Sequence, residues 1–317
     1  MDKKNVVIMA AGVGLFAFVA AKMGWSGMIQ ELKAVWIALP ILVGLSSLRL
    51  WLQTAAWSCA LKNDGIHVSV GQLMGARASS HGMGYLSVLG PLVSEPMRIS
   101  LLGENSAAAT LIDTGVYWFS SGIFGLVGCL CAIGCMGGHR HTGSLISLAV
   151  TTVIGMALIA GSKPMLPGLV RWLGGRAPLW LRHGEEVEVA IHNFKRRHPR
   201  AVANMFWLGI VCQVLIAAEV VAVFWCLRMP IHAGIILALE AASRVVRAMG
   251  GWVPARIGMD ESGMAAAFVT FGLPSASGMA LALARRTRDL LEVLVGFAWL
   301  AWRSRAQKAS GVATASC

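Results

Sequence analysis

Long apolar runs separated by short polar loops make up most of the chain. An apolar run of about 20 residues is long enough to cross a bilayer as a helix. Such runs, the fourth of them short, occupy residues 5–23, 35–58, 107–136, 144–160, 201–227, 231–249 and 275–302. The pattern predicts an all-α polytopic membrane protein with about seven transmembrane helices.

Two further apolar stretches, 68–103 and 250–274, are interrupted by Gly and Pro and carry charges. Proline and glycine break helical hydrogen bonding, and at membrane depth such a break survives only where protein or water covers it. We interpret both stretches as re-entrant segments, because paired broken segments are typical of transporter sites. The predicted structural breaks are Gly90, Pro91, Pro254 and Gly258.

Composition supports a membrane protein and excludes a soluble enzyme or a disordered chain. Hydrophobic residues form 56% of the 317 residues and charged residues only 13%, about half the charged fraction of a soluble domain. The 27 Lys and Arg exceed the 15 Asp and Glu, which gives a net charge of +12. These basic residues collect in short loops and at segment ends, so we expect membrane lipids as partners and no nucleic acid.

Basic loops also predict the topology. Lys3 and Lys4 place the N-terminus in the cytoplasm, and the basic loop 162–200 should lie on the same side. Both constraints hold if 68–103 returns to the side from which it enters. We treat residues 1–302 as a single integral membrane domain and residues 303–317 as a polar C-terminal tail, whose side of the membrane the pattern leaves open.

Several ionisable residues fall inside apolar segments, where they are expensive and usually face a cavity or a partner. Glu240, Arg244 and Arg247 share one helix face, because they lie at positions i, i+4 and i+7. The alternative is that such residues are helix-end anchors or internal ion pairs. The candidates for lipid or substrate binding are Glu95, Arg98, Arg244, Arg256, Glu261 and Arg285.

Sequence motifs of catalysis are absent from the chain. It has no phosphate-binding loop, no nucleophile elbow and no zinc-binding His-Glu-x-x-His. We therefore expect no cofactor, no metal and no catalytic residue.

At the two broken segments the sequence resembles a known family. It is similar to the transmembrane region of lysylphosphatidylglycerol synthases and their stand-alone, flippase-like relatives, and most similar to the branch associated with hopanoid biosynthesis. Residues 89–99 supply a Gly-Pro pair, an acidic residue and an Arg. Residues 254–261 supply a Pro, a Gly and a Glu, and a Gly-Leu pair and an Arg-rich helix start follow at 272–273 and 284–291. The resemblance covers the chain from the first span to about residue 302.

This resemblance implies a flippase-like protein of the bacterial inner membrane, which translocates or presents a hopanoid or an anionic phospholipid. The synthases add a soluble aminoacyl-transferase domain, whereas the longest polar segment here is under forty residues, so we do not expect the synthase activity. Two alternatives stay open. One is a non-catalytic membrane partner of lipid-biosynthesis enzymes. The other is an integral-membrane lipid-modifying enzyme in which Asp260 or Glu261 serves as a base or metal ligand.

Overall fold

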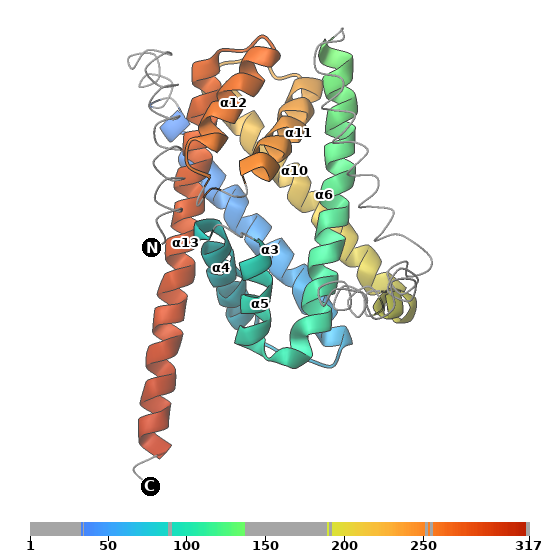
Figure 1. The fold of residues 1–317 in the computed structure, drawn as a ribbon, viewed down its shortest axis with the longest axis vertical. Helices are drawn as coiled ribbons and strands as arrows, with labels where there is room; N and C mark the ends of the chain where they lie inside the picture. Colours follow the sequence, from blue (N-terminus) through green and yellow to red (C-terminus); the bar gives the residue numbers. More distant parts are fainter. Residues whose placement is uncertain are drawn as a thin grey trace, which may run out of the picture.

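The computed structural model describes residues 33, 35–87, 91–136, 189, 192–250, 253 and 256–314. Within these ranges the chain forms helices joined by short turns (Figure 1). The elements are α3 (Leu39–Asn63), α4 (Val70–Leu86), α5 (Pro91–Leu102), the 3-10 turn η1 (Glu104–Ser106), α6 (Ala107–Met136), α10 (Pro199–Cys226), α11 (Ala233–Met249), α12 (Met259–Thr270) and α13 (Ser275–Thr314). The predicted spans 5–23 and 144–160 lie outside the described residues, as do Gly90 and Pro254.

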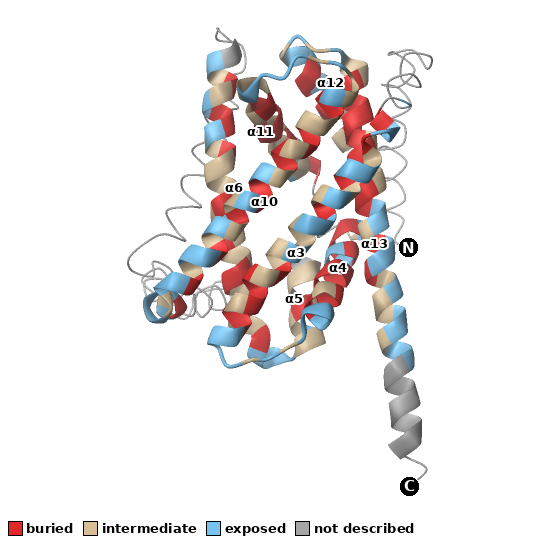
Figure 2. Ribbon diagram, turned by 180° about the vertical axis from the view of Figure 1, so that it is seen from behind, coloured by how far each residue is buried: buried red, intermediate tan, exposed pale blue. Residues whose placement is uncertain are grey.

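Three helices of the described part are long and apolar enough to cross a membrane, namely Leu39–Asn63, Glu104–Gly134 and Pro199–Cys226. They coincide with the predicted spans 35–58, 107–136 and 201–227. The exposed faces of these helices point outward, and buried residues line the interior of the bundle (Figure 2). On α10, the exposed Trp207 and Trp225 are separated by 18 positions. That is about 27 Å of helix, close to the thickness of the hydrocarbon core, where tryptophans mark the two interfaces.

The short helices form two hairpins that repeat one design. Helices α4 and α5 have 17 and 12 residues, and so do α11 and α12. Each pair packs together, and along the chain the first lies between α3 and α6 and the second between α10 and α13. In space α4 packs mainly against α13, α11 mainly against α6, and α12 mainly against α13. In Figure 1 the α4–α5 hairpin starts from the lower end of the bundle and the α11–α12 hairpin from the upper end, so that their tips approach in the middle.

This arrangement corrects one predicted span. Residues 231–249 are apolar enough to suggest a separate crossing, but α11 is one arm of a hairpin that returns through α12 to the end from which it started. The reversal occurs between Met249 and Met259, where the predicted break Gly258 lies. The prediction for 68–103 agrees with the hairpin formed by α4 and α5. The helix that contains the predicted span 275–302 continues to Thr314.

Local sequence explains where the short helices begin. Ser69 caps α4 by accepting a hydrogen bond from the Gln72 amide, and Pro91 opens α5, where its missing N–H costs nothing. Gly258 precedes α12 with φ of 80°, a left-handed conformation that glycine adopts without strain. The Glu261 carboxylate accepts a hydrogen bond from the Gly258 amide at 2.9 Å, which satisfies a free donor at the start of the helix.

Close backbone contact joins α6 to α11. A Cβ atom at Gly128 would lie 2.4 Å from the Leu237 carbonyl oxygen and 3.0 Å from the Ala241 Cβ. Lipid tails are as apolar as leucine, so helices in membranes associate through this kind of packing rather than through the hydrophobic effect. Gly128 therefore sets the distance between the second hairpin and α6.

We predict that Gly128→Ala lowers the free energy of unfolding by about 1–3 kcal/mol, because the added methyl group forces α6 and α11 apart. Thermal unfolding of the detergent-purified protein measures the effect. Gly134→Ala on the same helix is the matched control, since no atom lies within 4 Å of its Cβ position. Equal midpoints for the two variants would contradict the packing argument.

Candidate functional site

One group of buried charges joins α3, α4, α5 and α6, and we call it the Asp113 cluster. Arg77 and Arg98 both donate hydrogen bonds to the Asp113 carboxylate, the latter at 2.7 Å. The Arg98 guanidinium also lies over the Trp57 ring, 4.1 Å from its centroid. Trp57 in turn donates its indole N–H to the Thr110 hydroxyl at 3.2 Å. The cluster ties both arms of the first hairpin to the long helices on either side.

Glu95 extends this cluster toward the surface. Its carboxylate accepts hydrogen bonds from Arg98 at 3.3 Å and from the Thr114 hydroxyl at 2.8 Å. The Glu95 side chain is 22% exposed, against 4% for Asp113. Arg98 is therefore shared between a fully buried carboxylate and one that partly faces the surroundings.

A second group of charges, the α13 network, joins α13 to α10 and α11. Arg285 lies between Glu219 at 3.3 Å and Glu240, and Arg288 pairs with Glu219 and with Asp289 beside it. All five residues are at most 6% exposed. Each arginine is thus neutralised by two carboxylates, which is the arrangement that buried charge requires.

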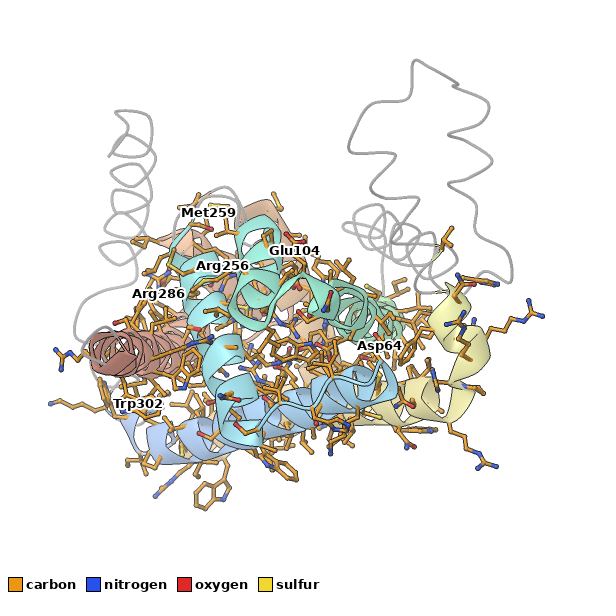
Figure 3. The ribbon with its side chains drawn as sticks, turned by 90° about the horizontal axis from the view of Figure 1, so that it is seen from below. Asp64, Glu104, Arg256, Met259, Arg286 and Trp302 are labelled. Carbon is orange, nitrogen blue, oxygen red and sulfur yellow. The ribbon has the colours of Figure 1, made fainter. Side chains whose placement is uncertain are left out.

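The tip of the second hairpin meets both this network and the first hairpin. Arg256 pairs with Asp260 at 3.0 Å and reaches Asp289 at 4.0 Å. Its guanidinium also lies 5.3 Å from the ring centroid of Tyr85, near the end of α4. Arg286 holds the start of α12 by contacting Glu261 at 2.8 Å and the Arg256 carbonyl at 3.1 Å. Figure 3 labels Arg286, which belongs to α13, and Arg256 near it; α13 is seen nearly end-on.

Arg244 lies apart from both groups. It projects from α11 between α6 and α10, where it donates hydrogen bonds to the Ser121 hydroxyl and, at 2.9 Å, to the Gln213 side-chain oxygen. The Phe124 ring lies 5.6 Å from its guanidinium carbon. These contacts are all with neutral groups.

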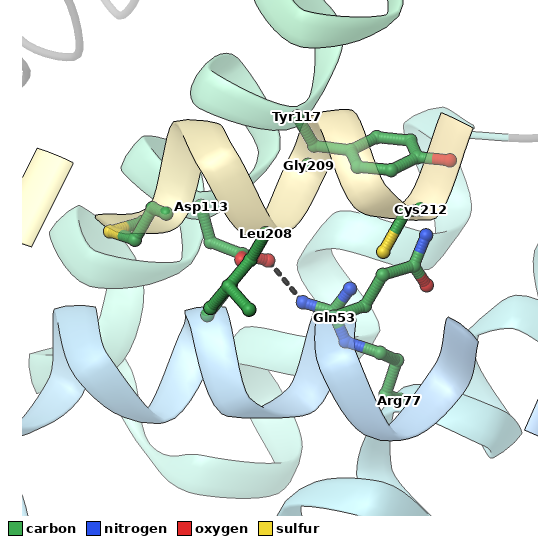
Figure 4. Close-up of a pocket in the computed structure, with 9 residues that line it drawn as sticks. Gln53, Arg77, Asp113, Tyr117, Leu208, Gly209 and Cys212 are labelled. Carbon is green, nitrogen blue, oxygen red and sulfur yellow. Dashed lines mark hydrogen bonds and ion pairs between the residues drawn. The ribbon is translucent and has the colours of Figure 1, made fainter. Parts of the chain in front are cut away.

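A small cavity adjoins the Asp113 cluster (Figure 4). Its volume is about 10 Å³, close to the minimum that holds one water molecule. The residues around it come from α3, α4, α6 and α10, and they are Gln53, Ala56, Arg77, Asp113, Tyr117, Met205, Leu208, Gly209 and Cys212. A lipid headgroup does not fit in this space, so the cavity is a packing defect or a water site.

The structure distributes the six predicted binding residues over three places. Glu95 and Arg98 lie in the Asp113 cluster, Arg256, Glu261 and Arg285 lie in or beside the α13 network, and Arg244 stands between α6 and α10. What the sequence does not reveal is which carboxylates neutralise these arginines, namely Asp113, Glu219, Glu240 and Asp289. Asp113 and Glu219 stand alone in apolar runs, which is the available signal, whereas Asp289 follows a run of arginines.

Chemically, the site is a set of fixed charges inside an apolar bundle. Its guanidinium groups are suited to binding oxyanions. A movement of the hairpins would change the contacts of Arg256 with Tyr85 and Asp289 at their tips. Among the described residues, no group of three His, Cys, Asp or Glu side chains has the arrangement of a metal site.

The chain matches the model of a known protein family. The sequence model of the family described as lysylphosphatidylglycerol synthase TM region matches residues 5–296. No curated protein and no solved structure shows a significant match. The matched range contains both hairpins and both groups of buried charges.

Asp113→Asn should destabilise the protein by about 3–5 kcal/mol, because it leaves Arg77 and Arg98 buried without their shared anion. Thermal unfolding in detergent measures the change. Glu95→Gln is the matched control and should cost about 1 kcal/mol, since Glu95 is partly exposed and Arg98 keeps Asp113. A larger loss for Glu95→Gln than for Asp113→Asn would refute the assignment of Asp113 as the centre of the cluster.

Proposed function

We propose, from the premise that the chain belongs to the lysylphosphatidylglycerol synthase TM region family, that it moves or presents a lipid between the leaflets of a bacterial inner membrane. The family and the long apolar helices make it a multi-pass integral membrane protein. The role we propose is transport or presentation rather than covalent chemistry. The cargo would be a hopanoid or an anionic phospholipid, handed over by lipid-biosynthesis enzymes as partners.

The observation that carries this proposal is the meeting of two hairpins from opposite ends of the bundle. Oppositely directed halves with broken helices at the centre are the architecture of many secondary transporters. Here the tips approach at the contact between Tyr85 and Arg256, beside the α13 network. A polar headgroup does not enter the hydrocarbon core by itself, but charged side chains at the hairpin tips would bind it at that depth. The lipid tails would stay in the bilayer.

Arg256 is the charged residue best placed to change partners as a headgroup passes. Its side chain is 24% exposed, whereas those of Arg285 and Arg288 are 5% and 2% exposed. Arg256 also contacts groups from three helices, namely Tyr85, Asp260 and Asp289. A phosphate could replace one of these contacts without leaving a deeply buried charge unpaired.

The distribution of basic residues supports an orientation. One end of the bundle contains the end of α3, the start of α10 and the end of α13. It bears Lys62, Arg196, Arg197, Arg200, Arg303 and Arg305, whereas the other end bears Lys33 and Arg228 within the described residues. By the positive-inside rule, the basic end faces the cytoplasm. The C-terminus and the open side of the first hairpin would then also be cytoplasmic.

In liposomes that contain a fluorescent phosphatidylglycerol, the protein should expose the inner-leaflet pool to dithionite. Arg256→Gln should slow this exposure about tenfold or more, because it removes a charge-assisted contact with the headgroup. Arg305→Gln, an exposed charge change near the end of α13, is the control and should behave as wild type. If wild type moves neither this lipid nor a labelled hopanoid, the transport proposal fails and the partner role gains support.

A fusion at the C-terminus tests the orientation. Green fluorescent protein should fluoresce there and alkaline phosphatase should be inactive, because the C-terminal end of α13 lies at the basic end of the bundle. Fluorescence and phosphatase activity of whole cells measure the two fusions. The reverse pair of results would place the basic end outside and contradict the orientation.

A further inference from the structure

Arg244 differs from most arginines inside the bundle in its counter-charge. Seven arginines of the described helices have a carboxylate oxygen within 4.0 Å: Arg49, Arg77, Arg98, Arg256, Arg285, Arg286 and Arg288. Within the same described part of the chain, no carboxylate forms an ion pair with Arg244. A cation in this position is costly unless an anion joins it.

The neighbouring charges do not supply that anion. Around the α13 network, five arginines (Arg49, Arg256, Arg285, Arg286 and Arg288) face six carboxylates (Glu219, Glu240, Asp260, Glu261, Asp289 and Glu292). Arg247 makes the two numbers equal. It is repelled by Arg256 and Arg285 and attracted by Asp289 and Asp260, and it forms no direct ion pair with a carboxylate of the described residues. Among the charges inside the described bundle, Arg244 is thus left as the cation in excess.

Unused hydrogen-bond donors surround this excess charge. The Gln213 side chain is fully buried, and its oxygen accepts from Arg244 at 2.9 Å, so its amide nitrogen lies on the same side chain beside the guanidinium. Within the described residues that nitrogen has no hydrogen-bond partner. The Nε of Arg244 has none there either, as is also true of the Nε atoms of Arg77, Arg98 and Arg285. A buried donor without an acceptor costs about 1–3 kcal/mol. The unused Gln213 amide nitrogen beside a cation without a carboxylate partner indicates a missing group that is negatively charged and accepts hydrogen bonds.

The depth of Arg244 and Gln213 in the bundle limits which kind of anion can reach them. Ser121 and Gln213 each lie 14 positions after the first residue of their helix, in helices of 30 and 28 residues. They therefore lie about 21 Å along α6 and α10, near the middle of two helices long enough to cross the membrane. An oxyanion that reaches this depth arrives most readily on a molecule whose remainder is soluble in the bilayer.

We propose that Arg244, Gln213 and Ser121 form a binding site for one oxyanion, the phosphodiester or carboxylate of a lipid headgroup. The guanidinium of Arg244 supplies the charge and its free Nε a donor, the amide of Gln213 supplies a second donor, and the Ser121 hydroxyl and the Phe124 ring hold the guanidinium between α6 and α10. The site is distinct from the ion-paired arginines of the hairpin tips. The lipid identity of the ligand rests on the proposed function, whereas the oxyanion site does not.

Thermal unfolding of the detergent-purified full chain with added ligands tests the site. The ligands are phosphatidylglycerol, a diacylglycerol with the same chains and inorganic phosphate. We expect phosphatidylglycerol to raise the unfolding midpoint of wild type, and the diacylglycerol to have no effect. Arg244→Gln should raise the half-saturating concentration of phosphatidylglycerol about tenfold or more, because it removes a charged hydrogen-bond partner. Arg305→Gln controls for the loss of one positive charge.

Gln213→Glu is the second variant, and it keeps the test valid if Arg244→Gln folds poorly. It places a carboxylate of nearly the same shape beside Arg244, so that the protein provides the missing anion itself. We expect a higher unfolding midpoint without ligand than in wild type, and loss of the shift caused by phosphatidylglycerol. If Gln213 had a purely structural role, Gln213→Glu would raise the unfolding midpoint but would leave the shift caused by phosphatidylglycerol unchanged.

The outcomes separate this proposal from the proposed function. If phosphatidylglycerol shifts wild type and both variants equally, lipid binding holds but the site is wrong. If inorganic phosphate alone shifts wild type and the variants lose that shift, the oxyanion site stands and a free anion replaces the lipid as its ligand. If neither ligand shifts wild type, the site is overturned. Leaflet exposure by the wild-type protein would still support transport in that case.

Discussion

Charge neutralisation inside an apolar bundle is the constraint on which the rest of this structure depends. Lipid tails are as apolar as the helices, so little hydrophobic driving force holds one helix against another within the bilayer. A buried carboxylate or guanidinium, by contrast, is costly until it meets its partner. Asp113 fixes α4, α5 and α6 to one another in this way, and Glu219 and Glu240 fix α10 and α11 to α13.

The same constraint explains how the hairpins are supported. A short helix that ends at membrane depth leaves free backbone groups, and these need protein partners. The Glu261 carboxylate accepts a hydrogen bond from the Gly258 amide at the start of α12, and Arg286 binds both Glu261 and the Arg256 carbonyl. The arginine-rich start of α13 is therefore part of the structure of the hairpin tip. Its role there is distinct from that of a basic anchor at the membrane surface.

Sequence patterns predicted the parts of the fold that depend on local properties. The bounds of α6 follow from a long apolar run in which Asp113 is the one charged residue, and the broken pattern of 68–103 indicates a hairpin. The pattern of 231–249 did not reveal a hairpin, because a segment that forms a helix of 17 residues suits either a crossing or one arm of a hairpin. The reversal of the chain near Gly258 distinguishes a hairpin from a crossing. Local sequence does not predict this reversal, because it depends on the helices against which α12 packs.

The candidate site was predictable as a set of residues but not as a set of partners. Arg288 and Glu219 are 69 positions apart, so no local spacing reveals that they neutralise each other. Arg98, Arg244 and Arg285 consequently stood in one set of candidate binding residues. In the structure Arg98 and Arg285 each face two carboxylates, and a ligand anion would have to displace them at high cost. An arginine held only by neutral groups has no such competition, and this asymmetry makes Arg244 the residue most available to a ligand.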